Sequence, residues 1–292
     1  EILAGDIDRL IQRKAFHEIG NETRRKITGD GAFVLANSHN TLAGSSDLNS
    51  LLPESGWLTT SYTNITNDSI GYHVDTDTYQ ITGGVDKRIN DWIVGLSTTY
   101  AYTEIEIPSF GIGSQGDVNS FLITPYIAYI INQNFFVSGI TSYSYTRDEP
   151  DAPGTSIDTH ASTTELTVNG HTTIDEWTIV GLAGTRYNHG ELTTKQPIIG
   201  KTDTNRDDWT YLVEMQVGYS LDQHVKGLRI HAEALYEYLD SDTDEDDGVL
   251  YMSGGFDYSV NKDLILGLSY SHDVNNEDLD IGRVELNASL DF

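Results

Sequence analysis

The sequence predicts a transmembrane antiparallel β-barrel of about twelve strands, with an N-terminal α-helix in or near its pore. Three observations support this fold class. From residue 56 onward, turn residues separate segments rich in Tyr, Thr, Val and Ile, a composition typical of strands. The connections between these segments alternate between short and long. Within the segments, apolar residues alternate with polar or small residues, and aromatic residues bracket the apolar face, as in barrels that contact lipid.

The composition limits the possible functions. The chain has 45 Asp and Glu residues against 17 Lys and Arg residues, and we expect no nucleic-acid partner because phosphate binding requires a basic surface. It has no cysteine, which excludes disulfides, thiolate metal sites and cysteine nucleophiles. No run of about 18 apolar residues occurs, so the sequence offers no transmembrane helix.

Residues 1–54 differ from the remainder and are expected to form a helix and a connector. The segment from Asp6 to about Lys26 has helical spacing of apolar residues, and Gly20 weakens its second half. The apolar positions on one face are Ile7, Leu10, Ile11, Ala15 and Ile19. The segment also holds six basic residues, which are Arg9, Arg13, Lys14, Arg24, Arg25 and Lys26. Residues 31–54 are rich in Gly, Ser and Asn and form the expected connector.

Residues 55–292 are expected to form the barrel. The expected strands cover residues 56–64, 72–88, 92–107, 119–132, 135–147, 159–174, 177–190, 208–221, 228–240, 248–261, 264–275 and 279–292. The long connections between them are 65–71, 108–118, 148–158, 191–207 and 241–247. Outer-membrane barrels have short periplasmic turns and longer outer loops. We therefore expect a bacterial outer-membrane protein with both ends of its barrel on the periplasmic side.

Aromatic residues recur at both ends of the apolar face, where they are expected to form girdles at the two membrane interfaces. The expected girdle residues are Trp92, Tyr100, Tyr102, Phe135, Tyr143, Tyr145, Trp177, Tyr187, Trp209, Tyr236 and Tyr238. Because alternation also occurs in soluble β-sandwiches, a soluble sandwich or solenoid remains the alternative fold.

The opposite face of several strands carries polar and ionisable residues, which a water-filled lumen permits. They are Glu214, Gln216, Arg229, His231, Glu233, Glu237, Arg283 and Glu285. The basic helix residues are expected to pair with the carboxylates among them, since screening is weaker there than in bulk water. This pairing favours a helix inside the pore over a helix in the periplasm or on a partner.

The C-terminal segment has apolar residues at alternate positions and ends in the aromatic residue Phe292. It resembles the terminal-strand signature by which the barrel-assembly machinery recognises outer-membrane proteins. We therefore expect Phe292 to be an assembly signal, the alternative being an ordinary edge strand that ends in Phe.

Residues 71–100, GYHVDTDTYQITGGVDKRINDWIVGLSTTY, resemble the early hairpin of the autotransporter translocator domain of Gram-negative bacteria. The twelve expected strands, the terminal Phe292 and the helix before the first strand are also similar, so the resemblance covers about residues 55–292. It implies a barrel in the outer membrane whose pore helix is linked to a secreted passenger. Two possibilities are open: a passenger was removed before Glu1, or the barrel never had one. Outer-membrane lipid and lipopolysaccharide are the other expected partners.

No enzyme and no cofactor are expected. The nine histidines are scattered without metal-binding spacing, and the sequence contains no Gly-rich phosphate loop. The acidic segment 240–248 offers a weak Ca²⁺ candidate in Asp242, Asp244 and Asp246, but a solvated outer loop is the simpler interpretation.

Three functions remain in competition. In the first, the barrel exports or anchors a surface polypeptide. In the second, it is a passive porin-like channel for small solutes. In the third, it is a structural anchor for a surface or periplasmic partner. The channel hypothesis rests on the small residues Gly95, Ser97, Thr99 and Ala101, which leave space in the bore.

Overall fold

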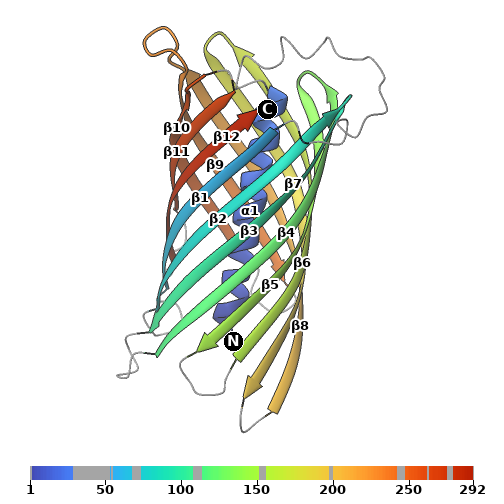
Figure 1. Ribbon diagram of the computed structural model, residues 1–292, viewed down its shortest axis with the longest axis vertical. Helices are drawn as coiled ribbons and strands as arrows, with labels where there is room; N and C mark the ends of the chain where they lie inside the picture. Colours follow the sequence, from blue (N-terminus) through green and yellow to red (C-terminus); the bar gives the residue numbers. More distant parts are fainter. Residues whose placement is uncertain are drawn as a thin grey trace.

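The computed structural model describes residues 2–28, 53, 55–67, 74–107, 114–150, 156–196, 200–241, 247–261, 263–274 and 279–291. These residues form one helix and twelve antiparallel strands that close into a barrel around the helix (Figure 1). Each strand pairs with its neighbours in sequence, and β1 pairs with β12 to close the sheet. The expected fold class is confirmed. Among the described residues, no helix is long and apolar enough to span a membrane.

The helix α1 covers Ile2–Thr28. The strands are β1 (Ser55–Asn67), β2 (Val74–Ile89), β3 (Trp92–Ile107), β4 (Ser114–Asn132), β5 (Phe135–Pro150), β6 (Ser156–Ile174), β7 (Trp177–Gln196), β8 (Gly200–Ser220), β9 (Leu228–Ser241), β10 (Asp247–Ser259), β11 (Leu264–Asp273) and β12 (Leu279–Asp291).

The two ends of the barrel differ. At one end, which we call the turn end, β2 joins β3 and β6 joins β7 through two-residue turns. Asn90 and Asp175 adopt the left-handed conformation in these turns, with φ of 56° and 52°, a conformation that Asn and Asp tolerate better than most residues. The start of β1 and the end of β12 also lie at the turn end, where Ser55 pairs with Asp291. We call the opposite end the loop end.

Side chains along each strand alternate between an outward and an inward face, because successive residues of a pleated strand point to opposite sides of the sheet. The outward face is apolar, and aromatic pairs cross between strands at both of its ends. Trp92 packs on Tyr129 at the turn end, with ring centroids 4.6 Å apart. Tyr187 packs on Trp209 near the loop end, with centroids 5.0 Å apart. All eleven expected girdle residues lie on this outward face, half-buried or exposed. Two aromatic bands therefore frame an apolar belt.

The inward face is rich in Ser and Thr, whose hydroxyl groups pair with one another across strands. Thr78 and Thr103 lie 2.9 Å apart, Thr82 and Thr99 lie 3.1 Å apart, and Ser120 and Thr146 lie 2.7 Å apart, each between hydroxyl oxygens. We call these pairs the hydroxyl ladder. They satisfy buried polar groups within the wall itself.

The hairpin of β7 and β8 is longer than expected. Residues 191–207 were expected to form a loop, but β7 continues to Gln196 and β8 starts at Gly200. The Thr193 hydroxyl donates a hydrogen bond of 2.7 Å to Asp203 across the hairpin, and β-branched Thr residues favour strands. The residues of β8 before Asp208 pair with β7 only, so this hairpin extends past β9 (Figure 1).

The helix also differs from the expectation, since it continues without interruption through Gly20. Ile19 and Thr23 on either side of this glycine are buried, and contacts with the barrel wall override the low helix propensity of glycine. The expected connector 31–54, apart from Pro53, lies outside the described residues.

Candidate functional site

The helix α1 runs through the lumen from the loop end to the turn end. Ile11 clusters with Ile105 of β3 and Val118 of β4, near the loop end of these strands. Ile27 clusters with Ile93 of β3 and Phe136 of β5, near the turn end. The N marker in Figure 1 accordingly lies at the loop end and the C marker at the turn end. The first turns of α1 therefore lie toward the loop end and its last turns toward the turn end.

One side of α1 is apolar and packs against β1 to β5. Phe16 and Ile19 are almost fully buried and cluster with Trp57, Tyr126 and Ile140. Of the expected apolar helix positions, Ile11, Ala15 and Ile19 are buried here, whereas the side chains of Ile7 and Leu10 lie outside the described residues. Phe16 was not expected at this interface, although its spacing from Ile19 is helical.

The small wall residues of β3 do not leave an open bore. Ala101 is buried beside Ile11 and Ala15 of the helix. At Gly95, an added Cβ atom would lie 2.0 Å from the ring of Tyr126, so the ring occupies the space that the missing side chain leaves. The small residues thus receive the helix and its packing partners, contrary to the channel hypothesis.

The other side of α1 is charged and pairs with carboxylates of the wall. Arg9 lies 3.3 Å from Asp208 of β8, Arg13 lies 2.7 Å from Glu237 of β9, and Arg24 lies 2.6 Å from Glu214 of β8. Lys14 pairs with Glu285 of β12 and lies 3.4 Å from Glu18. Four of the six basic residues predicted from the sequence therefore contact the barrel. The side chains of Arg25 and Lys26 lie outside the described residues.

Arg13 contacts a carboxylate, a hydroxyl group and an aromatic ring of the wall. Its guanidinium donates a hydrogen bond of 2.6 Å to the Tyr251 hydroxyl and lies 3.7 Å from the centroid of the Tyr251 ring. Its partner Glu237 also accepts a bond of 3.3 Å from Arg186 of β7. Arg186 in turn donates bonds of 2.9 and 2.7 Å to Glu165 of β6. The helix is thus joined to a charged network within the wall.

Glu165, Arg186 and Asp208 were missed by the sequence analysis. Each lies at an inward position of its strand, in phase with buried Thr residues such as Thr163 and Thr210. A search for ionisable residues at every inward position of every strand would have found them.

Neutral polar contacts complete the attachment of the helix. Gln12 donates a hydrogen bond of 2.7 Å to the Ser144 hydroxyl and accepts one from Thr163. Glu22 accepts a bond of 3.0 Å from Ser289 of β12. The helix therefore contacts strands on every side of the lumen.

A cavity of about 130 Å³ remains between the charged side of α1 and the wall. The expected luminal residues Gln216, Arg229, His231 and Arg283 line it. The Nδ1 atom of His231 lies 3.4 Å from Asp257. The expected luminal residues thus all lie inside the barrel, either at this cavity or in contact with the helix.

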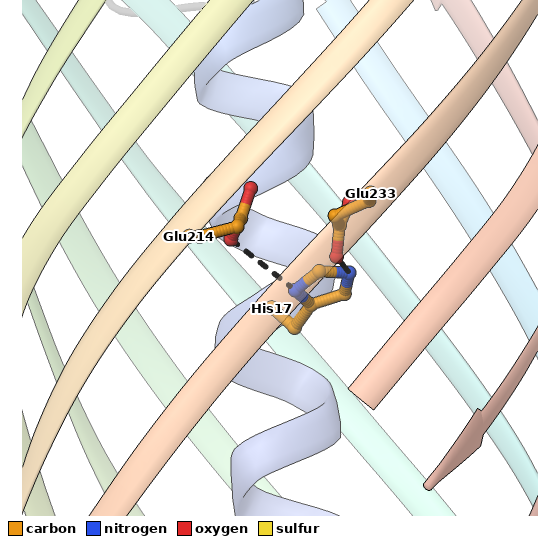
Figure 2. Close-up of side chains that lie close together, drawn as sticks. All are labelled: His17, Glu214 and Glu233. Carbon is orange, nitrogen blue, oxygen red and sulfur yellow. Dashed lines mark ion pairs between the residues drawn. The ribbon is translucent and has the colours of Figure 1, made fainter. Parts of the chain in front are cut away.

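His17 of α1 lies between Glu214 and Glu233 beside the same cavity (Figure 2). Its Nδ1 atom is 3.9 Å from Glu214 and its Nε2 atom is 3.4 Å from Glu233. The sequence analysis regarded the histidines as scattered, since residues 17, 214 and 233 share no motif. Only the closure of the barrel around the helix brings them together.

The extended hairpin carries a separate titratable pair beyond the aromatic band. His189 donates a hydrogen bond of 2.8 Å to Asp207, which also accepts a bond of 2.7 Å from Tyr187. The hydrogen bond with Asp207 raises the pKa of His189 above its ordinary value. The bonds from Tyr187 and His189 lower the pKa of the Asp207 carboxyl. The expected Ca²⁺ candidates Asp242, Asp244 and Asp246, and the expected assembly signal Phe292, lie outside the described residues.

Residues 56–151, which cover β1 to β5 apart from Ser55, match the model of the autotransporter β-domain family. This part of the barrel is similar to an autotransporter β-domain. Domains of this family translocate a passenger across the bacterial outer membrane, which is the function and the location expected from the sequence. A β-domain of this family implies a passenger domain.

Solved structures of such β-domains have the same fold. The translocator domain of autotransporter NalP from Neisseria meningitidis has a TM-score of 0.67 at 13% identity, covering 97% of this chain and 98% of that one. The β-domain of the Bordetella autotransporter BrkA has a TM-score of 0.67 at 12% identity, covering 82% of this chain and 100% of that one. The transport unit of the autotransporter AIDA-I from Escherichia coli has a TM-score of 0.60 at 11% identity, covering 91% and 98%. No curated protein sequence matches this chain.

Proposed function

We propose that this β-domain delivers and holds a passenger that precedes α1, and that α1 is the segment that closes the pore after export. The direction of the helix carries this proposal. Because α1 enters at the loop end and its last residues reach the turn end, a polypeptide attached before residue 1 lies on the loop-end side. Outer-membrane barrels place long loops outside the cell, so the passenger would be displayed at the surface.

The contacts of α1 support a closing role over a merely transient passage. Its charged side makes buried ion pairs with three strands, and its apolar side is packed against the opposite wall. A buried ion pair is costly to break because it leaves an unpaired charge in a poorly solvated environment. The helix is therefore expected to remain in the lumen at rest.

Conductance across a planar bilayer tests the closing role. The intact chain should remain mostly closed, and a variant that lacks residues 2–28 should conduct steadily because the helix no longer occupies the lumen. Steady conductance of the intact chain, at the level of the truncated barrel, would contradict the proposal. Both proteins must first show the heat-dependent gel mobility of a folded barrel.

An epitope tag tests the direction. A tag placed before Glu1 should be removed by protease added to intact cells, whereas a tag inserted in the turn between β6 and β7, at the turn end, should be protected. The opposite pattern would place the loop end in the periplasm and refute the proposed orientation.

The C-terminal strand and the outer surface suggest two further partners. We propose that Phe292 and the alternating apolar residues before it are recognised by the barrel-assembly machinery, and that the loop end contacts lipopolysaccharide. Phe292→Ala should lower the amount of barrel in the outer membrane of cells while leaving refolding in detergent unchanged. Equal amounts of variant and unaltered barrel in the outer membrane would refute the assembly role.

A further inference from the structure

His17, Glu214 and Glu233 bring together three side chains that are able to bind a metal, from three different elements of the fold. His17 belongs to α1, Glu214 to β8 and Glu233 to β9. One ligand atom of each lies within 4.8 Å of the others. Figure 2 shows both carboxylates directed at the imidazole ring.

The spacing is close to that of a first coordination shell. Tetrahedral Zn²⁺ with bonds of about 2.0–2.1 Å to nitrogen and oxygen separates its ligands by roughly 3.4 Å. The Nε2 atom of His17 lies 3.4 Å from Glu233, whereas Glu214 lies 3.9 Å from the other ring nitrogen, Nδ1. One ligand atom of each residue lies within 4.8 Å of the other two, so side-chain rotations that shorten these separations would direct one ring nitrogen and two carboxylate oxygens at a common ion. The adjoining cavity offers space for water as a further ligand.

Both carboxylates of the cluster are buried beside the imidazole ring, with Glu214 only 4% exposed and Glu233 8% exposed. Glu214 also pairs with Arg24, at 2.6 Å from Oε1, and Glu233 lies 3.4 Å from His17.

The other cations of the helix pair elsewhere. Lys14 pairs with Glu285 and Glu18, and Arg13 pairs with Glu237. The ion pairs of these two cations are therefore with carboxylates other than the two that face the imidazole.

A second group of contacts orients the imidazole ring. The Asn21 side chain lies 2.8 Å from Nε2 of His17 and is itself bonded to Arg24. Histidines that bind metals commonly have their second ring nitrogen held by a polar partner, which fixes the orientation of the ring. Asn21 is placed to hold one nitrogen while the other binds the ion.

We propose that His17, Glu214 and Glu233 form a Zn²⁺ site that joins the pore helix to β8 and β9. An imidazole with two carboxylates favours Zn²⁺ over Mg²⁺ or Ca²⁺, which prefer ligand sets made of oxygen alone. Because one ligand comes from the helix and two come from the wall, the site is complete only while the helix is in the lumen. Zn²⁺ therefore stabilises the closed state.

Metal binding is measured on the full chain in detergent after removal of metals with a chelator. Calorimetry and metal analysis should find one Zn²⁺ per chain, and Co²⁺ should produce visible absorption. His17→Ala and Glu233→Gln should each abolish this binding, and Asn21→Ala should weaken it by about 10–100-fold, as for other residues that orient metal ligands. His189→Ala is the matched control, since it removes a histidine outside the lumen and should leave binding unchanged.

Three results would overturn the proposal. The unaltered chain binds no stoichiometric Zn²⁺, it binds Ca²⁺ equally well, or both His17→Ala and Glu233→Gln retain the metal. Heat-dependent gel mobility establishes that each variant is folded, and Glu233→Gln preserves the shape of the side chain should His17→Ala disturb the helix.

Conductance gives a second measurement that does not depend on the first. If Zn²⁺ binds only the closed state, a concentration of 100 times the Kd should shift the equilibrium toward closure by about 100-fold. Closure by Zn²⁺ that persists in Glu233→Gln would refute the site.

Discussion

Arg13→Met should loosen the pore helix more than loss of an ordinary surface charge. Methionine keeps much of the length and apolar volume of the side chain but removes its guanidinium. The variant loses the 2.7 Å ion pair with Glu237, the 2.6 Å hydrogen bond to the Tyr251 hydroxyl and the contact with the Tyr251 ring. The barrel wall itself is unaltered, so the effect falls on the attachment of α1.

The magnitude follows from what remains after the substitution. A hydrogen bond to a charged group contributes about 1.5–3 kcal/mol, and a partly buried cation–π contact adds about 1 kcal/mol. The larger cost of about 3–5 kcal/mol for a buried charge left without a partner does not apply, because Glu237 keeps Arg186. We therefore expect a loss of about 2.5–4 kcal/mol, which is roughly a 60–700-fold shift toward the open state at 1.4 kcal/mol per factor of ten.

Single-channel recording in planar bilayers measures this shift as open probability. Lys195→Met is the matched control, since it also removes a positive charge and a 2.7 Å ion pair, with Asp158, but from an exposed site on the extended hairpin. Exposed pairs contribute about 0–1 kcal/mol, so its open probability should change little. The reasoning is refuted if Arg13→Met and Lys195→Met behave alike.

Three further predictions concern the wall, the hairpin and the pore. Gly95→Ala forces the Tyr126 ring to move and should destabilise the barrel by about 1–3 kcal/mol. The loss should be seen as a lower midpoint temperature in heat-dependent gel mobility. Gly181→Ala is the control and should leave this midpoint unchanged, because its added Cβ meets no atom closer than 4.0 Å. The pKa of His189, followed by NMR, should lie above its ordinary value and should fall in Asp207→Asn. The contact between His189 and Asp207 stabilises the hairpin at pH values below the ordinary pKa of histidine, and this stabilisation is lost as the pH rises through the raised pKa. An unchanged His189 titration in Asp207→Asn would contradict the role of the contact. The pore without α1 should prefer cations, because removal of the helix uncovers wall carboxylates; a reversal potential that indicates anion preference excludes it.

Sequence periodicity predicted the barrel well because its strands obey a local rule. Trp92 and Val94 lie on the same outward face because side chains two positions apart in a strand point to the same side. This alternation depends on no contact with distant residues. The pairing of Arg13 or Arg24 with wall carboxylates was also foreseeable in kind, since a basic helix inside an acidic barrel has few other partners.

Specific partners and strand ends were not predictable in this way. Whether Arg13 meets Glu237 or Glu233 depends on the rotation of α1, which its apolar contacts with β3 to β5 determine. The extension of β7 and β8 depends on hydrogen bonds such as that from Thr193 to Asp203, which exist only when the register is known. The cluster of His17 with two glutamates requires both kinds of information together.

The hydroxyl ladder has a consequence for what the lumen offers to a polypeptide. Because Thr78 bonds to Thr103 and Ser120 bonds to Thr146, these hydroxyl groups already have partners within the wall and need none from a chain in the lumen. Other wall hydroxyls, those of Ser144 and Thr163, bond to Gln12 of α1 instead. The wall therefore divides its polar groups between its own strands and the helix that fills it.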